Sequence, residues 1–202
     1  QGGVRLIAVS KKVPVPRILE ALRSGQFDFA ESYVQEALKK IAAIEDRRVR
    51  WHFIGRLQSN KIKRIAQHFF WVHSLSEVKH ARQLSQARML SSIPLNVCVQ
   101  VNVSGEQTKS GVSVDQVGDL IDVVNELPHL RFRGLMCMAQ KTEEPGELRR
   151  VFGVTAALQR QVIERGIACD TLSIGMSADY VEAIAAGSTM VRIGSAIFGE
   201  RE

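Results

Sequence analysis

Two lysines, Lys11 and Lys12, stand at the end of an apolar run in the segment LIAVSKK, residues 6–12. The run predicts a buried strand, and few strands of a protein core end on an ammonium group. On a strand, Lys11 shares a face with Val9 and Lys12 shares the opposite face with Ser10. Alternation alone leaves open which lysine points inward, and either one could face solvent. An amine in a partly desolvated pocket would have a lowered pKa and could act as a nucleophile toward aldehydes.

Two glycine- and serine-containing loops near the C-terminus have the composition of an anion site. The segments SIGMSAD (173–179) and VRIGSAIFG (191–199) each lead out of an apolar run. Hydroxyl groups, close backbone approach and amides at a helix start suit a phosphate dianion. An ordinary strand-to-helix turn capped by Ser177 is the alternative for the first loop. The residues that would form the site are Gly175, Met176, Ser177, Gly194 and Ser195.

Arg192 lies inside an apolar run, between Val191 and Ile193. Alternation places Arg192 on the face opposite to these two neighbours. A guanidinium in a protein interior needs hydrogen-bond acceptors, because an unpaired buried charge is very costly. The acceptor could be a structural carboxylate such as Glu31, or it could be a ligand.

These residues need a scaffold that brings distant segments together. The chain alternates short apolar runs, which predict strands, with longer amphipathic stretches, which predict helices. The predicted strands are residues 5–11, 27–31, 51–55, 71–75, 95–103, 130–138, 169–175 and 189–198. The predicted helices are residues 16–25, 32–44, 59–69, 76–90, 113–127, 146–166 and 177–187.

Strict alternation of strands and helices implies parallel pairing with right-handed crossovers. Eight strands in 202 residues predict a closed (β/α)8 TIM barrel that forms a single domain over residues 1–202. An open doubly wound sheet is the second possibility, although no G-x-G-x-x-G follows the first strand, as a dinucleotide-binding domain would require. Chemistry in such barrels gathers at the C-terminal ends of the strands, where a phosphate cradle, Arg192 and a strand-end lysine would meet. This combination suggests pyridoxal 5′-phosphate (PLP), with the lysine as Schiff base and the loops holding the phosphate.

Four blocks of the sequence resemble one protein family. They are AVSK (8–11), WHFIGRLQSNK (51–61), GLM (134–136) and GMSADYVEAIAAGSTMVRIGSAIFGER (175–201). Their order and spacing resemble those of the PLP homeostasis (YggS/PROSC) family, from about residue 4 to the C-terminus. The resemblance implies the fold-type III PLP architecture, which is similar to the N-terminal barrel of alanine racemase. Members usually begin with a helix before the first strand, and we expect this chain to lack it.

The resemblance assigns roles to individual residues. It implies that Lys11 carries PLP, and that Lys12, where other members vary, points outward or lies behind the residues that contact the cofactor. It also implies that Arg192 faces the pyridine nitrogen, where it can only donate a hydrogen bond, so the ring nitrogen stays unprotonated and the cofactor is a poor electron sink. The remaining implied cofactor-site residues are Met136, Gly175, Met176, Ser177, Gly194 and Ser195.

Three further residues are weaker candidates for the cofactor site. The segment FAESYVQE (29–36) departs from the family pattern, with Ala30 in place of Gly and Ser32 in place of Asn. The shorter Ser32 could change a contact near the cofactor or could cap the following helix. His52 could be a satisfied core histidine, and Asn60 could point into the barrel mouth or cap a helix.

Composition restricts the classes of function. A hydrophobic content of 45% and a charged content of 24% are typical of a globular protein, and no apolar run is long enough to span a bilayer. The net charge is +6, but aromatic residues make up only 6% of the chain, which argues against a nucleic-acid site. Cys98, Cys137 and Cys169 form no metal-binding or C-x-x-C pattern, so we expect buried free thiols and a cytoplasmic location.

Three functions remain open at this point. The first is PLP homeostasis or carriage without committed turnover, by a monomer whose partners would be PLP and apo-forms of PLP enzymes. The second is a small PLP-dependent racemase, which needs a second base, for which Tyr33 and His52 are the modest candidates. The third is a nucleic-acid or protein-interaction module that uses the basic surface. For the first function we expect no specific nucleic acid and no membrane as a partner.

Overall fold

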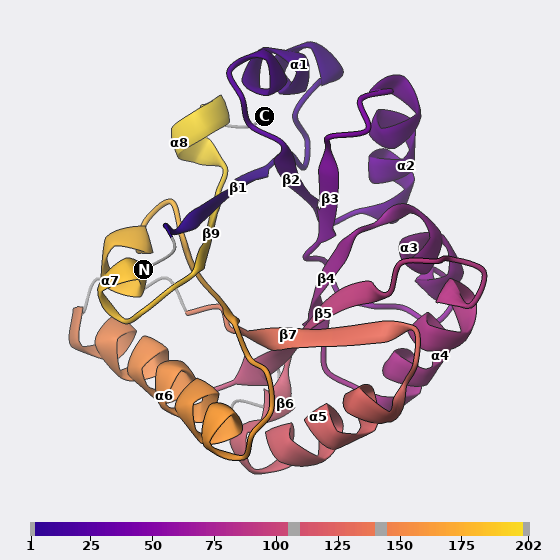
Figure 1. Ribbon diagram of the computed structural model, residues 1–202. Helices are drawn as coiled ribbons and strands as arrows, with labels where there is room; N and C mark the ends of the chain where they lie inside the picture. Colours follow the sequence, from indigo (N-terminus) through magenta and orange to yellow (C-terminus); the bar gives the residue numbers. More distant parts are fainter. Residues whose placement is uncertain (1–2, 105–109, 140–144, 200–202) are drawn as a thin grey trace.

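The strands form a closed parallel barrel. A computed structural model describes residues 3–104, 110–139 and 145–199. Neighbouring strands pair in the order β4-β3-β2-β1-β9-β8-β7-β5, and a β4–β5 pairing closes the ring, so the predicted (β/α)8 barrel is confirmed (Figure 1). The barrel strands are β1 (Arg5–Val9), β2 (Asp28–Glu31), β3 (Arg50–Phe53), β4 (Trp71–Leu75), β5 (Leu95–Asn102), β7 (Leu130–Met136), β8 (Thr171–Met176) and β9 (Met190–Ile193).

Helices surround the barrel as an outer layer (Figure 1). They bury apolar stripes against the strands, as amphipathic crossover helices of parallel sheets do. The short strand β6 (Val112–Ser113) pairs with β5 outside the ring. The helices are α1 (Val15–Arg23), α2 (Val34–Ala43), α3 (Ile62–His68), α4 (Val78–Arg88), α5 (Val117–Glu126, after the 3-10 turn Val114–Gln116), α6 (Pro145–Glu164), α7 (Tyr180–Ala185) and α8 (Ser195–Phe198).

Two sequence predictions about local structure are wrong. Residues 189–198 do not form one strand, because β9 ends at Ile193 and α8 begins at Ser195. Gly194 lies between these two elements, with φ −122° and ψ −71°. Ser32 does not cap α2, whose N-cap residue is Tyr33 and which has no side-chain capping hydrogen bond.

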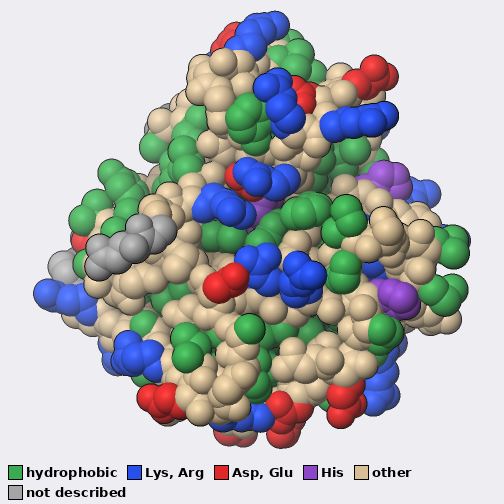
Figure 2. Space-filling view, in the orientation of Figure 1, with side chains coloured by type: hydrophobic (Ala, Val, Ile, Leu, Met, Phe, Trp, Pro, Cys, Tyr) green, Lys and Arg blue, Asp and Glu red, His purple; other side chains and the backbone are tan. Residues whose placement is uncertain are grey.

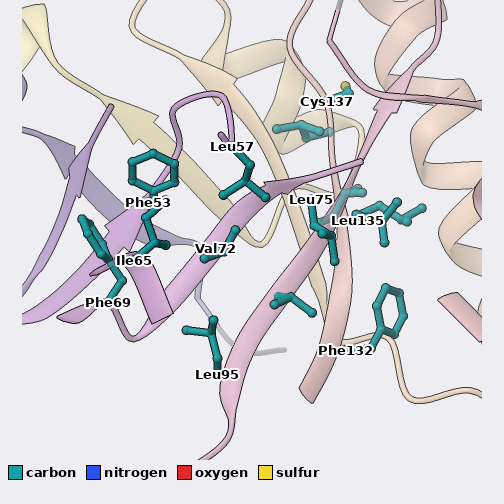
Figure 3. Close-up of a cluster of buried hydrophobic side chains, with 14 of the residues drawn as sticks. Phe53, Leu57, Ile65, Phe69, Val72, Leu75, Leu95, Phe132, Leu135 and Cys137 are labelled. Atoms are coloured by element: carbon teal, nitrogen blue, oxygen red, sulfur yellow. The ribbon is translucent and has the colours of Figure 1, made fainter. Parts of the chain in front are cut away.

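The core has two layers. The larger layer lies between the strands and the helices; part of it, with Phe53, Phe69, Val72 and Leu135 among the side chains, appears in Figure 3. The smaller layer comprises Ile7, Val9, Ala30, Trp71, Cys98, Met136 and Met190. Since Ile7 and Val9 alternate with Ala8, which belongs to the larger layer, the smaller cluster lies inside the barrel.

The surface carries both signs of charge. In the space-filling view of Figure 2, basic and acidic side chains are interspersed and no continuous basic stripe is visible on this face. Several basic residues are paired, for example Arg133 with Asp170 and Arg165 with Asp122. None of the helices among the described residues is long and apolar enough to cross a membrane.

The close approach of β7 to β8 gives a stability test. A Cβ atom on Gly134 would lie 1.7 Å from the carbonyl oxygen of Thr171, so Gly134→Ala requires a backbone shift in the barrel wall. We expect it to lower the free energy of unfolding by about 3 kcal/mol or more in urea denaturation. Gly153→Ala is the matched control, because a Cβ there meets nothing within 4 Å in the middle of α6 and should add about 1 kcal/mol. Equal effects of the two substitutions would contradict the packing argument.

Candidate functional site

The predicted site residues follow three neighbouring strands. β1 pairs with β9, and β9 pairs with β8, all in parallel. Lys11 follows β1, Ser177 follows β8 and Gly194 follows β9. Parallel strands end at the same edge, so the barrel brings these segments to one mouth although 166 residues separate Lys11 from Ser177 in the chain.

The structure distinguishes the two lysines. Val9 belongs to the cluster inside the barrel, while the Ser10 hydroxyl donates outward to Glu31 Oε1 over 2.6 Å. Lys11 stands in the turn two residues after Val9, is half-buried, and its ammonium group has no partner among the described residues. Lys12 is exposed and adopts the left-handed φ of 61°.

A buried ion cluster on α2 holds the turn around Lys11. Lys40 Nζ donates to the Ser10 carbonyl at 2.6 Å, to Glu31 Oε1 at 2.8 Å and to Glu36 Oε1 at 2.5 Å. Glu36 Oε1 also accepts the backbone N–H of Lys12 at 2.5 Å. Burial raises the pKa of Glu31, while hydrogen bonds from Lys40 and Ser10 act against that shift. The backbone on both sides of Lys11 is therefore fixed.

The two predicted phosphate loops are in contact. The backbone N–H of Gly194 donates to Ser177 Oγ at 3.2 Å, which joins the β8–α7 and β9–α8 loops. The Met176 amide is not free as expected, because it donates to Asp179 Oδ1 at 2.5 Å. The backbone N–H groups that have no acceptor among the described residues of these loops belong to Ser177, Ala178, Ser195 and Ala196.

Gly175 is needed where β8 turns into its loop. Its φ is 96°, a region that side chains rarely adopt, and a Cβ would lie 2.6 Å from Ala183 Cβ. Glycine at this position therefore allows the loop to pass closely over α7.

Arg192 is buried, with 3% of its surface exposed. Its Nη1 donates to the Ser173 carbonyl at 2.5 Å and to Ser173 Oγ at 2.7 Å, and its Nη2 donates to the Cys137 carbonyl at 2.9 Å. Glu31 is not its partner, so the suggested Arg192–Glu31 pair is wrong; Glu31 is instead paired with Lys40. Three of the five guanidinium N–H groups are thus used, and no carboxylate among the described residues pairs with Arg192.

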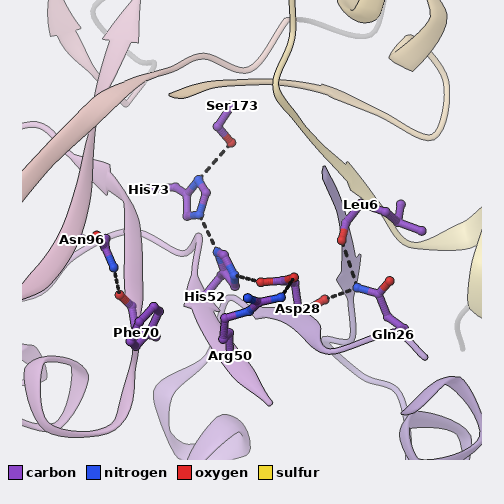
Figure 4. Close-up of polar contacts among 9 residues, drawn as sticks. All are labelled: Leu6, Gln26, Asp28, Arg50, His52, Phe70, His73, Asn96 and Ser173. Atoms are coloured by element: carbon purple, nitrogen blue, oxygen red, sulfur yellow. Dashed lines mark hydrogen bonds and ion pairs between the residues drawn. The ribbon is translucent and has the colours of Figure 1, made fainter. Parts of the chain in front are cut away.

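His52 is fully buried below this mouth. Its Nε2 lies 2.9 Å from Asp28 Oδ1 and its Nδ1 lies 2.8 Å from His73 Nε2, as Figure 4 shows. Both ring nitrogens have protein partners, as in the alternative of a satisfied core histidine. His73 and Ser173 are not among the residues predicted from the sequence, although a histidine inside the apolar run WVHSL is unusual enough to have indicated His73.

The remaining predicted residues differ in exposure. Met136 is fully buried inside the barrel. Ser195 is exposed and Ser32 is half-buried after β2. Asn60 is exposed and precedes Lys61, the N-cap residue of α3, which has no side-chain capping bond. The positions of Ser195, Ser32 and Asn60 fit the rim of the mouth, whereas Met136 lies deep within the barrel.

Comparisons with known proteins agree with this geometry. The family model "Alanine racemase, N-terminal domain" matches residues 1–202. The "Pyridoxal phosphate homeostasis protein" of Pseudomonas aeruginosa is 47% identical over 199 residues, which cover 98% of this chain and 85% of that protein. PipY of Synechococcus elongatus, solved with PLP bound, has a TM-score of 0.87 at 33% identity and covers 97% of this chain and 92% of its own. An alanine racemase of Clostridium difficile has a TM-score of 0.82 at 13% identity, covering 99% and 53%, which shows the shared fold alone.

The buried histidines predict a pH dependence of stability. Burial lowers the pKa of His52 and lowers that of His73 further, so both are neutral in the folded protein. An unfolded histidine titrates near ~6.5, so below that pH the unfolded chain binds protons that the folded chain does not. The contribution of these histidines to the free energy of unfolding should be constant above about pH 6.5. Below that pH the free energy of unfolding should fall by up to about 1.4 kcal/mol per histidine for each pH unit.

Urea denaturation at a series of pH values measures this slope. His73→Gln should reduce it, because glutamine does not titrate. His68→Gln is the matched control, since it makes the same substitution at an exposed position on α3, outside the buried pair. An unchanged slope in His73→Gln would show that the folded protein binds this proton after all.

Proposed function

This chain belongs to the alanine racemase N-terminal domain family and, within it, to the PLP homeostasis proteins, and on that premise we propose that it binds PLP through Lys11 and serves PLP homeostasis without a committed reaction. One observation supports the proposal: the adjacent strands β1, β9 and β8 bring the half-buried Lys11, the buried Arg192 and two joined anion-type loops to one end of the barrel. The residues therefore fit the cofactor.

Lys11 would supply the covalent attachment. When bound, PLP supplies an aldehyde carbon that a primary amine can join with the loss of one water molecule. The Lys11 ammonium group has no protein partner among the described residues, and it follows a backbone that Lys40 fixes at Ser10. Its freedom from an ion pair leaves the amine available after loss of a proton.

The joined loops would hold the phosphate. Ser177 can still donate its hydroxyl hydrogen, because its oxygen accepts from Gly194. The unpaired amides of Ser177, Ala178, Ser195 and Ala196 add backbone donors from both loops. Such a set of convergent donors is typical of phosphate sites that do not depend on a lysine.

Arg192 would face the pyridine nitrogen with its two unused N–H donors. Arginine keeps its proton in proteins, so it donates to the nitrogen and leaves the ring neutral. A neutral ring withdraws electrons weakly, which suits a protein that holds PLP better than one that drives carbanion chemistry.

The structure offers no suitable second base for racemisation among the candidates named from the sequence. Tyr33 is 54% exposed and forms the N-cap of α2. His52 is fully buried, and both of its nitrogens are used by Asp28 and His73. We therefore favour the homeostasis function over the racemase alternative.

The setting of this function is part of the proposal. Cys98, Cys137 and Cys169 are free and buried, as expected, and burial raises the pKa of each thiol, that of Cys169 to about 12. Three unpaired thiols suit a reducing cytoplasm. There the protein would act as a monomer that supplies PLP to apo-forms of PLP enzymes, without a specific nucleic acid or membrane partner.

Matched lysine variants test the attachment. Purified protein incubated with PLP should gain a visible absorption band, and borohydride reduction should fix the label on the peptide that contains Lys11. Lys11→Ala should lose the band, whereas Lys12→Ala should keep it, since Lys12 is exposed and lies on the outer side. Loss of the band in Lys12→Ala with its retention in Lys11→Ala would refute the assignment.

A second experiment tests the absence of committed turnover. The PLP-loaded protein, incubated with L-amino acids in deuterium oxide, should produce no D-isomer and exchange the α-hydrogen at no more than about the rate of free PLP. Mass spectrometry and chiral chromatography measure both quantities. Sustained exchange or racemisation that Lys11→Ala abolishes would favour the racemase function.

A further inference from the structure

An unbroken series of polar contacts crosses the barrel interior below the site. It begins at Asp28 on β2, passes His52 on β3 and His73 on β4, and reaches Ser173 on β8, as Figure 4 shows. The contacts measure 2.9 Å from Asp28 Oδ1 to His52 Nε2, 2.8 Å from His52 Nδ1 to His73 Nε2, and 2.9 Å from His73 Nδ1 to Ser173 Oγ. Arg192 Nη1 then donates to the same hydroxyl at 2.7 Å. Five strands therefore contribute to one series that ends at the guanidinium.

The series permits one arrangement of protons when both histidines are neutral. The ionised Asp28 only accepts, so His52 carries its proton on Nε2 and accepts at Nδ1. His73 must then donate from Nε2, which leaves its Nδ1 as an acceptor. The Ser173 hydroxyl must donate to that nitrogen, and its oxygen lone pairs accept from Arg192. Every donor therefore points from Arg192 toward Asp28.

The charges around the histidines keep them neutral. Burial is the main cause that lowers the pKa of His52; Asp28 opposes it, and Arg5 and Arg50 reinforce it. Burial likewise lowers the pKa of His73, aided by the charges of His52 and Arg192. Hydrogen bonds from His52 and Arg50 and their charges lower the pKa of Asp28, although burial acts in the opposite direction.

Arg192 depends on this series for its orientation. Both hydrogens of Nη1 are held by Ser173, one by the carbonyl and one by the hydroxyl, and no carboxylate among the described residues holds the guanidinium from another side. When the Ser173 hydroxyl donates to His73, its oxygen lone pairs point toward Arg192. Without that acceptor the hydroxyl could rotate and turn its hydrogen toward Arg192 instead. The direction of the Ser173 hydroxyl is thus set by residues on the far side of the barrel.

We propose that His52, His73 and Ser173 are positioning residues for Arg192, holding its two unused N–H donors toward the bound cofactor through a directed hydrogen-bond series anchored at Asp28. This inference rests on the PLP binding proposed above. It extends the site to residues that touch no ligand, and it explains why polar side chains occupy an interior that Ile7, Trp71 and Met190 otherwise fill.

Matched serine variants test the series. Ser173→Ala removes the shared hydroxyl but keeps the backbone carbonyl, and it should weaken PLP binding, measured by the visible band, by ~10-fold. Ser188→Ala is the control, because Ser188 also carries a buried hydroxyl beside β8 and β9, but this hydroxyl donates to backbone carbonyls, including that of Ile174, and contacts neither Arg192 nor His73. It should destabilise the fold to a similar degree and leave PLP affinity within ~2-fold.

Two substitutions of His73 test whether the direction of its hydrogen bonds, rather than the volume of its side chain, supports PLP binding. His73→Leu fills a comparable volume but leaves His52 without its donor and Ser173 without its acceptor, so PLP affinity should fall as in Ser173→Ala. His73→Gln carries one donor and one acceptor on a side chain that can mimic the neutral ring, and it should restore most of the affinity. Equal affinity in the Leu and Gln variants would overturn the positioning role.

Nitrogen NMR of the PLP-free protein provides a readout that does not depend on the cofactor. In the parent protein, His52 and His73 should both show the Nε2–H tautomer, and Ser173→Ala should alter the tautomer or the protonation of His73, while Ser188→Ala leaves both unchanged. An Nδ1–H tautomer at His73 in the parent protein would refute the series. Failure of the parent protein to bind PLP would refute the proposed function and not these tautomers, whereas normal binding by Ser173→Ala would refute only the positioning role.

Discussion

A buried guanidinium that pairs with no carboxylate among the described residues is the constraint on which this barrel's interior depends. Arg192 is held by two backbone carbonyls and one hydroxyl, all neutral acceptors. A guanidinium held in this way keeps some of its N–H groups free to donate to a ligand, whereas a carboxylate partner would have occupied them. The polar strip of Asp28, His52, His73 and Ser173 is arranged around this need, and the apolar cluster fills the rest of the interior.

Much of the fold could be predicted from the sequence because the apolar runs and amphipathic stretches alternate strictly. The parallel order and the closure between β4 and β5 follow from that alternation and from strand number. The exception at residues 189–198 has a physical origin, since VRIGSAIF is apolar on both sides of Gly194 and a short apolar run cannot distinguish a strand from a helix. Capping failed at Ser32 for a related reason, because residue type alone does not fix the local backbone.

The site was only partly accessible from sequence. The loop residues Ser177 and Gly194 could be paired in advance because they follow adjacent strands. The alternation of residues left Lys11 and Lys12 open, and the prediction of Lys11 came from the family resemblance alone, since only the structure shows which face of β1 is interior. The partners of Arg192 could not be predicted, since a backbone carbonyl such as that of Cys137 has no signature in residue type. His73 and Ser173 are 100 residues apart, and only the closure of the barrel makes them neighbours.

The ion cluster of Lys40 has a consequence for the environment in which Lys11 works. Lys40 and Glu31 are almost completely shielded from water, with side-chain exposures of 6% and 0%. At ~0.1 M ionic strength, mobile ions largely screen exposed charges that lie more than about 10 Å apart, but they screen buried pairs far less. The turn that contains Lys11 is therefore insulated from changes in ionic strength, so added salt would alter the interactions of the charged surface before it disturbed this turn.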